Sequence, residues 1–198
     1  ILGQVFLGLI VGVTLYLSPS VVIKRNSEVV REGGAREIRF ETTDTKSLAT
    51  SIPFIKNNNL DYSEIIPLKD PAMKKILGVT IFIMMTVVVV MLLSNGVNLT
   101  DGVDGLASGS SAIVGIVLGI LAYVSSHHDM AGYLNTMFIP GAEELVIFAA
   151  TLVGATAGFL WYNSYPAQVF MGDTGSLALG GISGVFAILI RKELLLPI

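Results

Sequence analysis

Five hydrophobic stretches, separated by polar segments, dominate the pattern of this chain. They cover residues 1–17, 76–94, 108–126, 145–162 and 174–190. A helix needs about 20 apolar residues to cross a bilayer with its backbone hydrogen bonds satisfied internally, and most of these stretches approach that length. The pattern predicts an all-α polytopic membrane protein with about five transmembrane helices, forming a single transmembrane domain over residues 1–198. The glycines and serines of the last stretch favour tight helix packing in lipid.

The long polar segment, residues 18–75, separates the first two hydrophobic stretches. Within it, residues 28–41 read EVVREGGAREIRFE, two short β-type runs around a pair of glycines, which predicts a β-hairpin. Asn57, Asn58 and Asn59 are typical of a loop. Ten Lys and Arg side chains in the segment would make it cytoplasmic by the positive-inside rule. Eight acidic side chains accompany them, and the rule weakens for loops of about 60 residues, so this charge balance is a poor guide to orientation.

The composition agrees with a membrane protein. The chain is 53% hydrophobic and 14% charged, and its mean hydropathy of +0.74 lies outside the usual range for a soluble domain. The sequence contains no cysteine, which excludes disulfides and thiolate metal sites. No basic patch interleaved with aromatic residues favours nucleic-acid binding. Since both ends of the chain lie in apolar runs, without an initial Met or a basic n-region, we expect a fragment of a longer protein.

The first chemical motif follows the second hydrophobic stretch. Residues 98–109 read NLTDGVDGLASG, so Asp101 and Asp104 lie at the junction of two apolar segments. Aspartates three residues apart can share one face of a helical turn. Together with Asn98 and Thr100 they offer oxygen ligands suited to a Mg²⁺-dependent phosphate site or to binding a ribose and base. The alternative is a helix start capped by Asn, Thr or Asp.

The second motif lies between the last two hydrophobic stretches. Residues 163–176 read NSYPAQVFMGDTGS, and Asp173 is the one charged residue between Glu144 and Arg191. An isolated ionisable group in a membrane protein indicates a functional site. A helix N-cap is again the alternative. The two interpretations are compatible, because helix starts also attract phosphate oxygens.

Counting helices places the two motifs on the same side of the membrane. The chain crosses once outward and once back between them, so Asp101, Asp104 and Asp173 emerge together. The same count places three segments on the opposite side: residues 18–75, 127–144 and 191–192. His127 and His128 resemble a metal pair, but they belong to that opposite side, and we interpret them as part of a loop.

Taken together, the two motifs resemble signature loops of the polyprenyl-phosphate N-acetylhexosamine-1-phosphate transferases. Thr100 within NLTDG and the wording NSYPAQVFMGD are closer to the branch that transfers phospho-N-acetylmuramoyl-pentapeptide than to the N-acetylglucosamine branch. The resemblance implies Mg²⁺-dependent transfer from UDP-N-acetylmuramoyl-pentapeptide (UDP-MurNAc-pentapeptide) to undecaprenyl phosphate, giving lipid I and UMP for the peptidoglycan of the cell wall. It also implies the bacterial inner membrane, an active site facing the cytoplasm, an extracytoplasmic residue 18–75 segment, and the option of a homodimer.

The resemblance assigns roles to individual residues. The cytoplasmic active-site loops are residues 95–107 and 163–174, and the residues expected to act in catalysis are Asp101, Asp104 and Asp173. Asp173 is the implied metal ligand, Phe170 stacks on uracil, and Asn163 helps to hold the nucleoside. The implied uridine-proximal pocket is lined by Asn98, Asp101, Gly102, Val103 and Asp104. Without the motif, Phe170 would be interpreted as an aromatic anchor at a helix end.

Three features of the family have no counterpart in this sequence. They are an adjacent aspartate pair in an earlier cytoplasmic loop, an N-terminal loop with a functional lysine, and a later histidine-rich loop. We therefore expect these 198 residues alone to lack transferase activity.

Other functions remain as alternatives. An N-acetylglucosamine-1-phosphate transferase is the nearest, and a histidine-triplet loop downstream would argue against it. A membrane transporter is more distant, because its aspartates would lie near the bilayer midplane and its sequence would show internal repeats. A purely structural membrane subunit would not explain two aspartate loops on one side.

Overall fold

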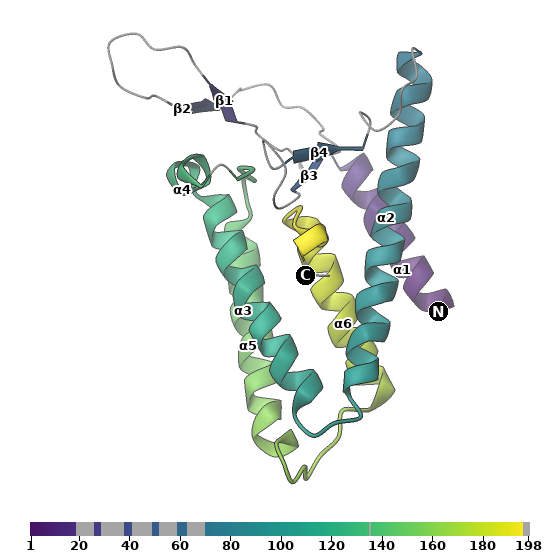
Figure 1. Cartoon of the computed structure of the whole chain (residues 1–198), viewed down its shortest axis with the longest axis vertical. Coiled ribbons are helices and arrows are strands. Elements are labelled where there is room, and N and C mark those ends of the chain that lie inside the picture. Colours follow the sequence, from purple (N-terminus) through teal and green to yellow (C-terminus); the bar gives the residue numbers. More distant parts are fainter. Residues whose placement is uncertain are drawn as a thin grey trace.

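The computed structural model describes residues 1–18, 26–28, 38–40, 49–51, 59–62, 70–134 and 136–195. Figure 1 shows a helical bundle with short strands at one end. Its helices are α1 (Leu2–Leu17), α2 (Pro71–Thr100), α3 (Leu106–Ser126), α4 (His128–Tyr133), α5 (Glu143–Asn163) and α6 (Gly172–Leu189), followed by the 3-10 turn η1 (Glu193–Leu195). Its strands are β1 (Asn26–Glu28), β2 (Ile38–Phe40), β3 (Ala49–Ser51) and β4 (Asn59–Asp61).

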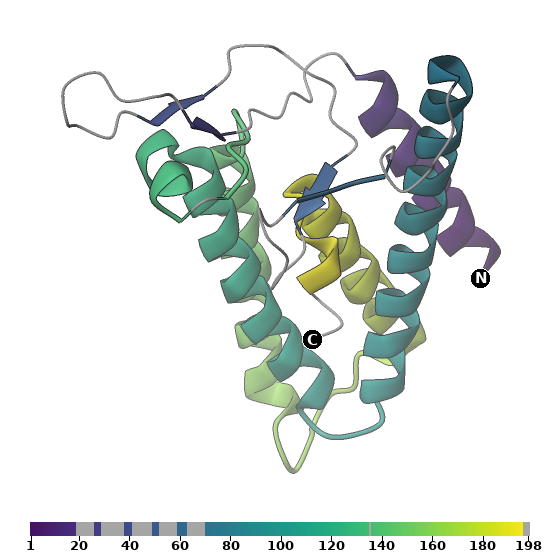
Figure 2. The same cartoon turned by 45° about the horizontal axis from the view of Figure 1, so that its top comes forward.

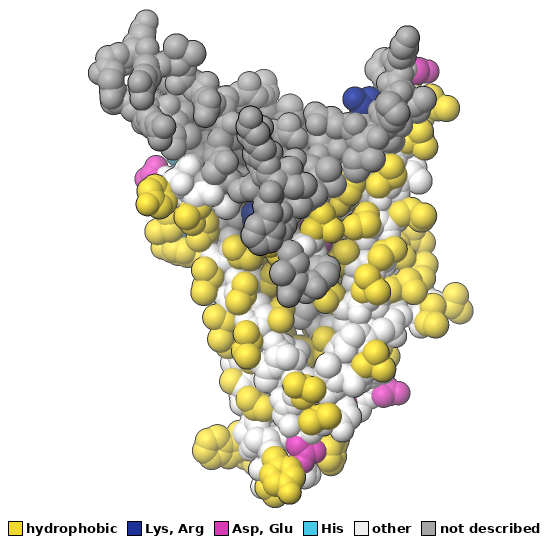
Figure 3. Space-filling model, viewed as in Figure 1, with side chains coloured by type: hydrophobic (Ala, Val, Ile, Leu, Met, Phe, Trp, Pro, Cys, Tyr) yellow, Lys and Arg dark blue, Asp and Glu magenta, His cyan; other side chains and the backbone are white. Residues whose placement is uncertain are grey.

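In the described part of the chain, four helices are long and apolar enough to cross a membrane: α2, α3, α5 and α6. The 16-residue helix α1 is also apolar but shorter. Figure 3 shows hydrophobic side chains over the flanks of the bundle and acidic side chains toward its ends. The predicted class, an all-α polytopic membrane protein, is confirmed.

Helix α2 is longer than the apolar stretch that predicted it. It begins after Asp70, whose side chain accepts a hydrogen bond from the backbone N–H of Ala72 at 3.0 Å, with Pro71 in the first turn. A carboxylate cap followed by proline is a favoured helix start. The helix continues through Thr100, so it includes the first residues of the NLTDG motif.

The bundle is built from two groups of helices. Helix α2 packs against α6 and α1, helix α3 packs against α5, and a smaller contact between α3 and α6 joins the groups (Figures 1 and 2). The α2–α6 contact is tight at Gly180. A Cβ atom at this position would collide with the carbonyl oxygen of Leu93 and would lie 2.7 Å from the Cα of Ser94. The expected role of small residues in helix packing is confirmed here.

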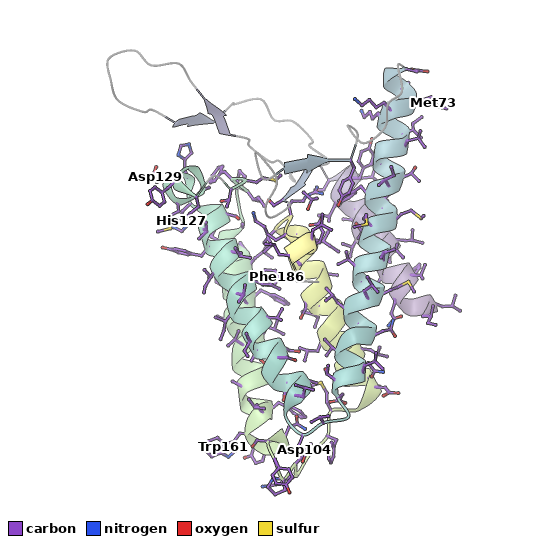
Figure 4. The ribbon with its side chains drawn as sticks, in the orientation of Figure 1. Met73, Asp104, His127, Asp129, Trp161 and Phe186 are labelled. Atoms are coloured by element: carbon purple, nitrogen blue, oxygen red, sulfur yellow. The ribbon has the colours of Figure 1, made fainter. Side chains whose placement is uncertain are left out.

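The core has two buried apolar clusters, and α6 contributes to both. Phe82, Val90 and Ile188 belong to the first, and Leu118 and Phe186 belong to the second. Figure 4 labels Phe186 in the middle of the bundle. Since α6 is shared by the two clusters, it holds the two helix groups together.

The candidate site residues and the two histidines lie at opposite ends of the helix bundle. Figure 4 shows Asp104 and Trp161 at one end of the bundle and Met73, His127 and Asp129 at the other. We call the first the aspartate end, which comprises residues 101–105, residues 164–171 and the first turn of α6. We call the second the strand end, which comprises the strands, α4 and residues 190–195. Among the described residues, the aspartate loops share one end of the bundle and the two histidines lie at the other, as counting helices predicted.

The strands partly agree with the sequence prediction. β1 pairs antiparallel with β2, with Asn26 opposite Phe40, as expected for a hairpin. The glycines expected at its turn lie outside the described residues. β3 and β4 form a second antiparallel pair that was not predicted.

Two loop predictions are wrong in detail. Asn59 begins β4 rather than lying in a loop, while Asn57 and Asn58 lie outside the described residues. His128 begins the short helix α4 rather than lying in a loop, while His127 is the extended cap residue between α3 and α4. Three-residue strands and a six-residue helix are too short for hydrophobic periodicity to reveal.

Candidate functional site

The first loop of the aspartate end is shorter than predicted. Residues 95–107 were expected to form a loop, but α2 ends at Thr100 and α3 begins at Leu106, which leaves residues 101–105. Gly105 has a φ of 75°, a left-handed conformation that favours glycine. Asn98 therefore lies on the last turn of α2, where a rigid helix positions it.

Asp104 joins the two loops. Its Oδ2 accepts a hydrogen bond from the backbone N–H of Ala167 at 3.1 Å, across 63 residues of sequence. Helix α3 has Gly105 at its N-cap and no side-chain cap, so the capping interpretation of Asp104 is wrong. This carboxylate instead holds the 164–171 loop beside the 101–105 loop.

Asn163 makes a second connection between the loops. Its side chain is 2% exposed, and its Oδ1 accepts hydrogen bonds from the backbone N–H of Gly105 at 3.2 Å and from Ser108 Oγ at 2.9 Å. Its Nδ2 donates to the carbonyl of Val169 at 2.9 Å. One buried amide thus connects the start of α3, the end of α5 and the loop that precedes α6.

Asn98 connects α2 with α6. Ser176, fully buried on the first turns of α6, donates from its Oγ to Asn98 Oδ1 at 2.7 Å. Near the same end, Ser94 Oγ donates to the carbonyl of Leu177 at 2.7 Å. These two contacts fix the start of α6 relative to the end of α2. The motifs that the sequence placed on one side therefore meet in space.

Asp173 and Phe170 face away from the protein. Phe170 is 61% exposed, and the carboxylate of Asp173 is exposed and has neither a hydrogen bond nor an ion pair with any described residue. Helix α6 begins at Gly172 after Met171 at its N-cap, so Asp173 lies in the first turn and does not cap the helix. The capping alternative is wrong here as well. Both side chains are available to a ligand.

The remaining predicted site residues also lie in the first loop. Gly102 and Val103 are exposed, the latter at 60%, and Asp101 is half-buried. Asp101 donates its backbone N–H to the carbonyl of Asn98 at 3.3 Å, which forms the turn after α2. The aspartate end thus combines a fixed polar framework with exposed carboxylate, aromatic and apolar side chains.

A metal ion would meet few protein ligands at this end. Among the described residues, no group of three or more His, Cys, Asp or Glu side chains is placed to hold a metal. Mg²⁺ commonly uses one or two carboxylates together with phosphate oxygens and water. The unengaged carboxylate of Asp173, at a helix start that also favours phosphate, fits this mode of binding.

A cluster of charges at the strand end was not predicted. Arg191, Lys192 and Glu193 follow α6 and are 4%, 4% and 2% exposed, respectively. Glu193 Oε1 accepts a hydrogen bond from Tyr62 Oη at 3.3 Å, and Lys192 Nζ donates to Ser51 Oγ at 2.8 Å. We call these three charged residues with Tyr62 and Ser51 the buried charge cluster.

The cluster ties the β3–β4 region to the end of α6. The backbone N–H of Ser51 donates to the carbonyl of Arg191 at 3.0 Å. The guanidinium carbon of Arg191 lies 4.6 Å from the ring centroid of Phe82, a cation–π geometry. Three consecutive charges directly after an apolar helix were a signal in the sequence, but their partners lie more than 100 residues away.

Burial shifts the pKa values in this cluster. It lowers the pKa of Lys192 to about 8, and the nearby Glu193 carboxylate opposes that shift. Burial also lowers the pKa of Arg191 and raises that of Glu193. The pKa of Tyr62 is raised by burial and by the charge of Glu193. These shifts follow from the desolvation of charged forms, and they indicate a structural cluster.

The chain, including both motifs, is similar to a known protein family and to several known proteins. The profile described as glycosyl transferase family 4 matches residues 47–191. The chain is 63% identical to a phospho-N-acetylmuramoyl-pentapeptide-transferase of Porphyromonas gingivalis, 61% identical to one of Parabacteroides distasonis and 59% identical to one of Bacteroides fragilis. Each alignment covers 100% of this chain and 47% of the relative. The chain therefore spans about half the length of the curated relatives that it matches.

Proposed function

The chain belongs to glycosyl transferase family 4, and from this membership we propose that the protein transfers phospho-N-acetylmuramoyl-pentapeptide from UDP to undecaprenyl phosphate. The products are lipid I and UMP, and the reaction requires Mg²⁺. Relatives of 59–63% identity that carry the name of this transferase support the assignment. The observation that carries it is the meeting of the two motif loops, through Asp104 and Ala167, at the end of the bundle where α6 begins with the exposed Asp173.

The exposed residues act on the nucleotide end of the substrate. Asp173 would supply a carboxylate to Mg²⁺, and the bound ion would neutralise the charge of the diphosphate. Phe170 offers an exposed face on which uracil stacks. Asp101 and Val103 line the same region, with Gly102 allowing close backbone approach.

The buried residues hold the two loops in register. Asn163 and Asp104 bind the loops to each other, and Ser176 holds Asn98. Fixed positions for donor and acceptor groups are the main protein contribution to phosphoryl transfer. In this proposal Asn163 supports nucleoside binding through the loop that it anchors.

Substrate discrimination tests the proposal. Purified full-length protein in detergent is expected to bind UDP-MurNAc-pentapeptide, and to release UMP from it when undecaprenyl phosphate and Mg²⁺ are present. UDP-N-acetylglucosamine is the matched competitor. Turnover of UDP-N-acetylglucosamine at an equal or higher rate would assign the protein to the N-acetylglucosamine branch. Binding of neither nucleotide would refute the transferase assignment.

The proposal also gives the membrane orientation. The aspartate end faces the cytoplasm of the bacterial inner membrane, where nucleotide-linked substrates are available. Ser164 and Tyr133 are both exposed and lie toward opposite ends of the bundle. In intact cells, a membrane-impermeant thiol reagent should label Tyr133→Cys and spare Ser164→Cys until the membrane is opened. The reverse pattern would invert the orientation.

A further inference from the structure

Ser108 occupies a special position on the first turns of α3. Its side chain is fully buried, and its Oγ lies 2.9 Å from Asn163 Oδ1 and 3.4 Å from the carbonyl oxygen of Gly105. A hydroxyl has one hydrogen to donate, and the shorter contact takes it. Ser108 therefore donates to Asn163 across 55 residues of sequence.

This hydrogen bond adds a second donor to the oxygen side of the Asn163 amide, whose orientation is set by the N–H of Gly105 and the carbonyl of Val169. The oxygen of the amide faces two donors, Ser108 Oγ and the backbone N–H of Gly105, so the NH₂ group must face the other way. There it meets the carbonyl of Val169 at 2.9 Å. In the flipped orientation the NH₂ group would face the Gly105 N–H, and Val169 would face an oxygen.

The carbonyl that Asn163 holds belongs to the residue before Phe170. The loop has two other anchors, the Asp104 carboxylate on the N–H of Ala167 and the carbonyl of Tyr162, which accepts from the N–H of Gln168 at 2.9 Å. Asn163 makes the last side-chain anchor before the exposed Phe170. The orientation of the Asn163 amide therefore fixes the backbone position from which the Phe170 side chain projects.

We propose that Ser108 is a positioning residue for nucleotide binding, which holds the Asn163 amide in place so that the 164–171 loop presents Phe170 to the planar base. This inference rests on the proposed function, because it takes a uridine nucleotide as the ligand of Phe170. Ser108 itself is buried and does not touch the ligand.

The same helix supplies a matched control. Ser111 lies one turn further along α3, is 3% exposed, and its Oγ has no hydrogen-bond partner in the described part of the protein. Ser108→Ala and Ser111→Ala thus remove the same atom from the same buried helix face. Only the first change should affect the 164–171 loop.

Two measurements on the full-length protein test the inference, with UMP as the probe. Ser108→Ala should weaken UMP binding by about five- to tenfold, the effect of losing one buried hydrogen bond. It should raise KM for the nucleotide substrate more than it lowers kcat, while Ser111→Ala changes neither. Without ligand, hydrogen exchange of the Ala167 and Gln168 amides should accelerate in Ser108→Ala alone.

A double-mutant cycle decides whether Ser108 acts through Phe170. If it does, Ser108→Ala should weaken UMP binding little further in a Phe170→Ala background. Fully additive losses would overturn the inference. So would parent-like UMP affinity in Ser108→Ala, or faster exchange throughout α3 and α5, which would indicate general destabilisation.

The failure of the proposed function would look different. If the protein does not act on uridine nucleotides, neither the parent protein nor the Phe170→Ala variant would bind UMP. If it belongs to the N-acetylglucosamine branch, UMP binding and the role of Ser108 would remain, and only the competition between the two UDP sugars would change. A normal loss of UMP affinity in Phe170→Ala, with parent-like behaviour of Ser108→Ala, would leave the proposed function standing and remove only the role of Ser108.

Discussion

Helix α6 has charged side chains at both ends, and their surroundings differ. At the aspartate end, Asp173 is exposed and has no partner among the described residues. At the strand end, Arg191, Lys192 and Glu193 are each at least 96% buried and contact strand residues or an aromatic ring. One helix therefore has an exposed carboxylate available to a ligand at its start, and buried charged side chains that contact other parts of the protein after its end.

This difference shows that residue type alone does not identify a functional charge. An exposed, unpaired carboxylate adds little to stability, so its presence at the end of an apolar helix favours a role toward a ligand. Buried charges with partners are expensive to disrupt and contribute to the specific arrangement of the chain. Changes at the two ends of α6 should accordingly affect different measurements.

The largest expected effect is on catalysis. Asp173→Asn keeps the size of the side chain and removes its charge, so turnover should fall by roughly 10³-fold or more, as for loss of a group that stabilises charge in the reaction. The melting temperature should change little, because the carboxylate has no partner to lose. Asp129→Asn, at an exposed acid of the strand end, is the control. Parent-like turnover of Asp173→Asn would remove the metal assignment.

At the other end of α6, the expected effect is on stability. Glu193→Ala removes the acceptor of the buried Tyr62 hydroxyl and the carboxylate whose charge acts on Arg191 and Lys192. It should destabilise the protein by about 1–3 kcal/mol, the range for leaving a buried polar group without its partner. Glu144→Ala, at an exposed position of the same end, should be nearly neutral. Denaturant unfolding in detergent measures both. A loss below about 1 kcal/mol in Glu193→Ala would show that the buried charge cluster is not structural.

A change between the two ends should affect stability through packing alone. Gly180→Ala introduces a methyl group against the α2 backbone and should cost about 1–3 kcal/mol, the usual effect of overpacking. In Gly181→Ala the new methyl would lie 3.8 Å from Leu7 Cδ2, an ordinary contact, so this variant should be neutral or more stable. Equal melting temperatures for the two variants would contradict the close α2–α6 approach.

The smallest effect is a dependence of stability on pH. Burial lowers the pKa of Lys192 to about 8 from its ordinary value of 10.5, so between these values the unfolded state binds more protons than the folded state. Stability should therefore rise with pH between about 8 and 10.5 relative to a Lys192→Met variant. Below pH 8 the difference between the two proteins should be constant. Melting curves of both proteins across this range measure the difference. Parallel pH profiles for the parent protein and Lys192→Met would contradict the lowered pKa of Lys192.

The sequence predicted the helices and the position of the site well, because both depend on long apolar runs and on counting crossings. It placed Asp101, Asp104 and Asp173 at one end, where the structure has them. It misplaced the end of α2, since the helix continues past its apolar part as far as Thr100.

The contacts within the site could not be predicted in the same way. The bonds of Asn163 with Gly105 and Ser108 join residues 58 and 55 positions apart, and no local pattern specifies such pairs. The buried charge cluster depends on the β3–β4 region reaching the end of α6, and Tyr62 and Glu193 are 131 positions apart. Long-range polar contacts of this kind depend on tertiary packing.

The close contact at Gly180 fixes one point of α6 against α2, so a tilt of α6 about this point would move its two ends in opposite directions. Asp173 lies seven residues to one side of Gly180 and Leu189 nine residues to the other, which gives arms of about 10 and 14 Å at 1.5 Å per residue. If the helix tilted to bring Asp173 1 Å toward a substrate, its far end, which leads into the buried charge cluster, would move about 1.3 Å the opposite way. The tightly packed interior there resists such a swing. Movement that accompanies substrate binding must then come from the 101–105 and 164–171 loops, while α6 itself stays still.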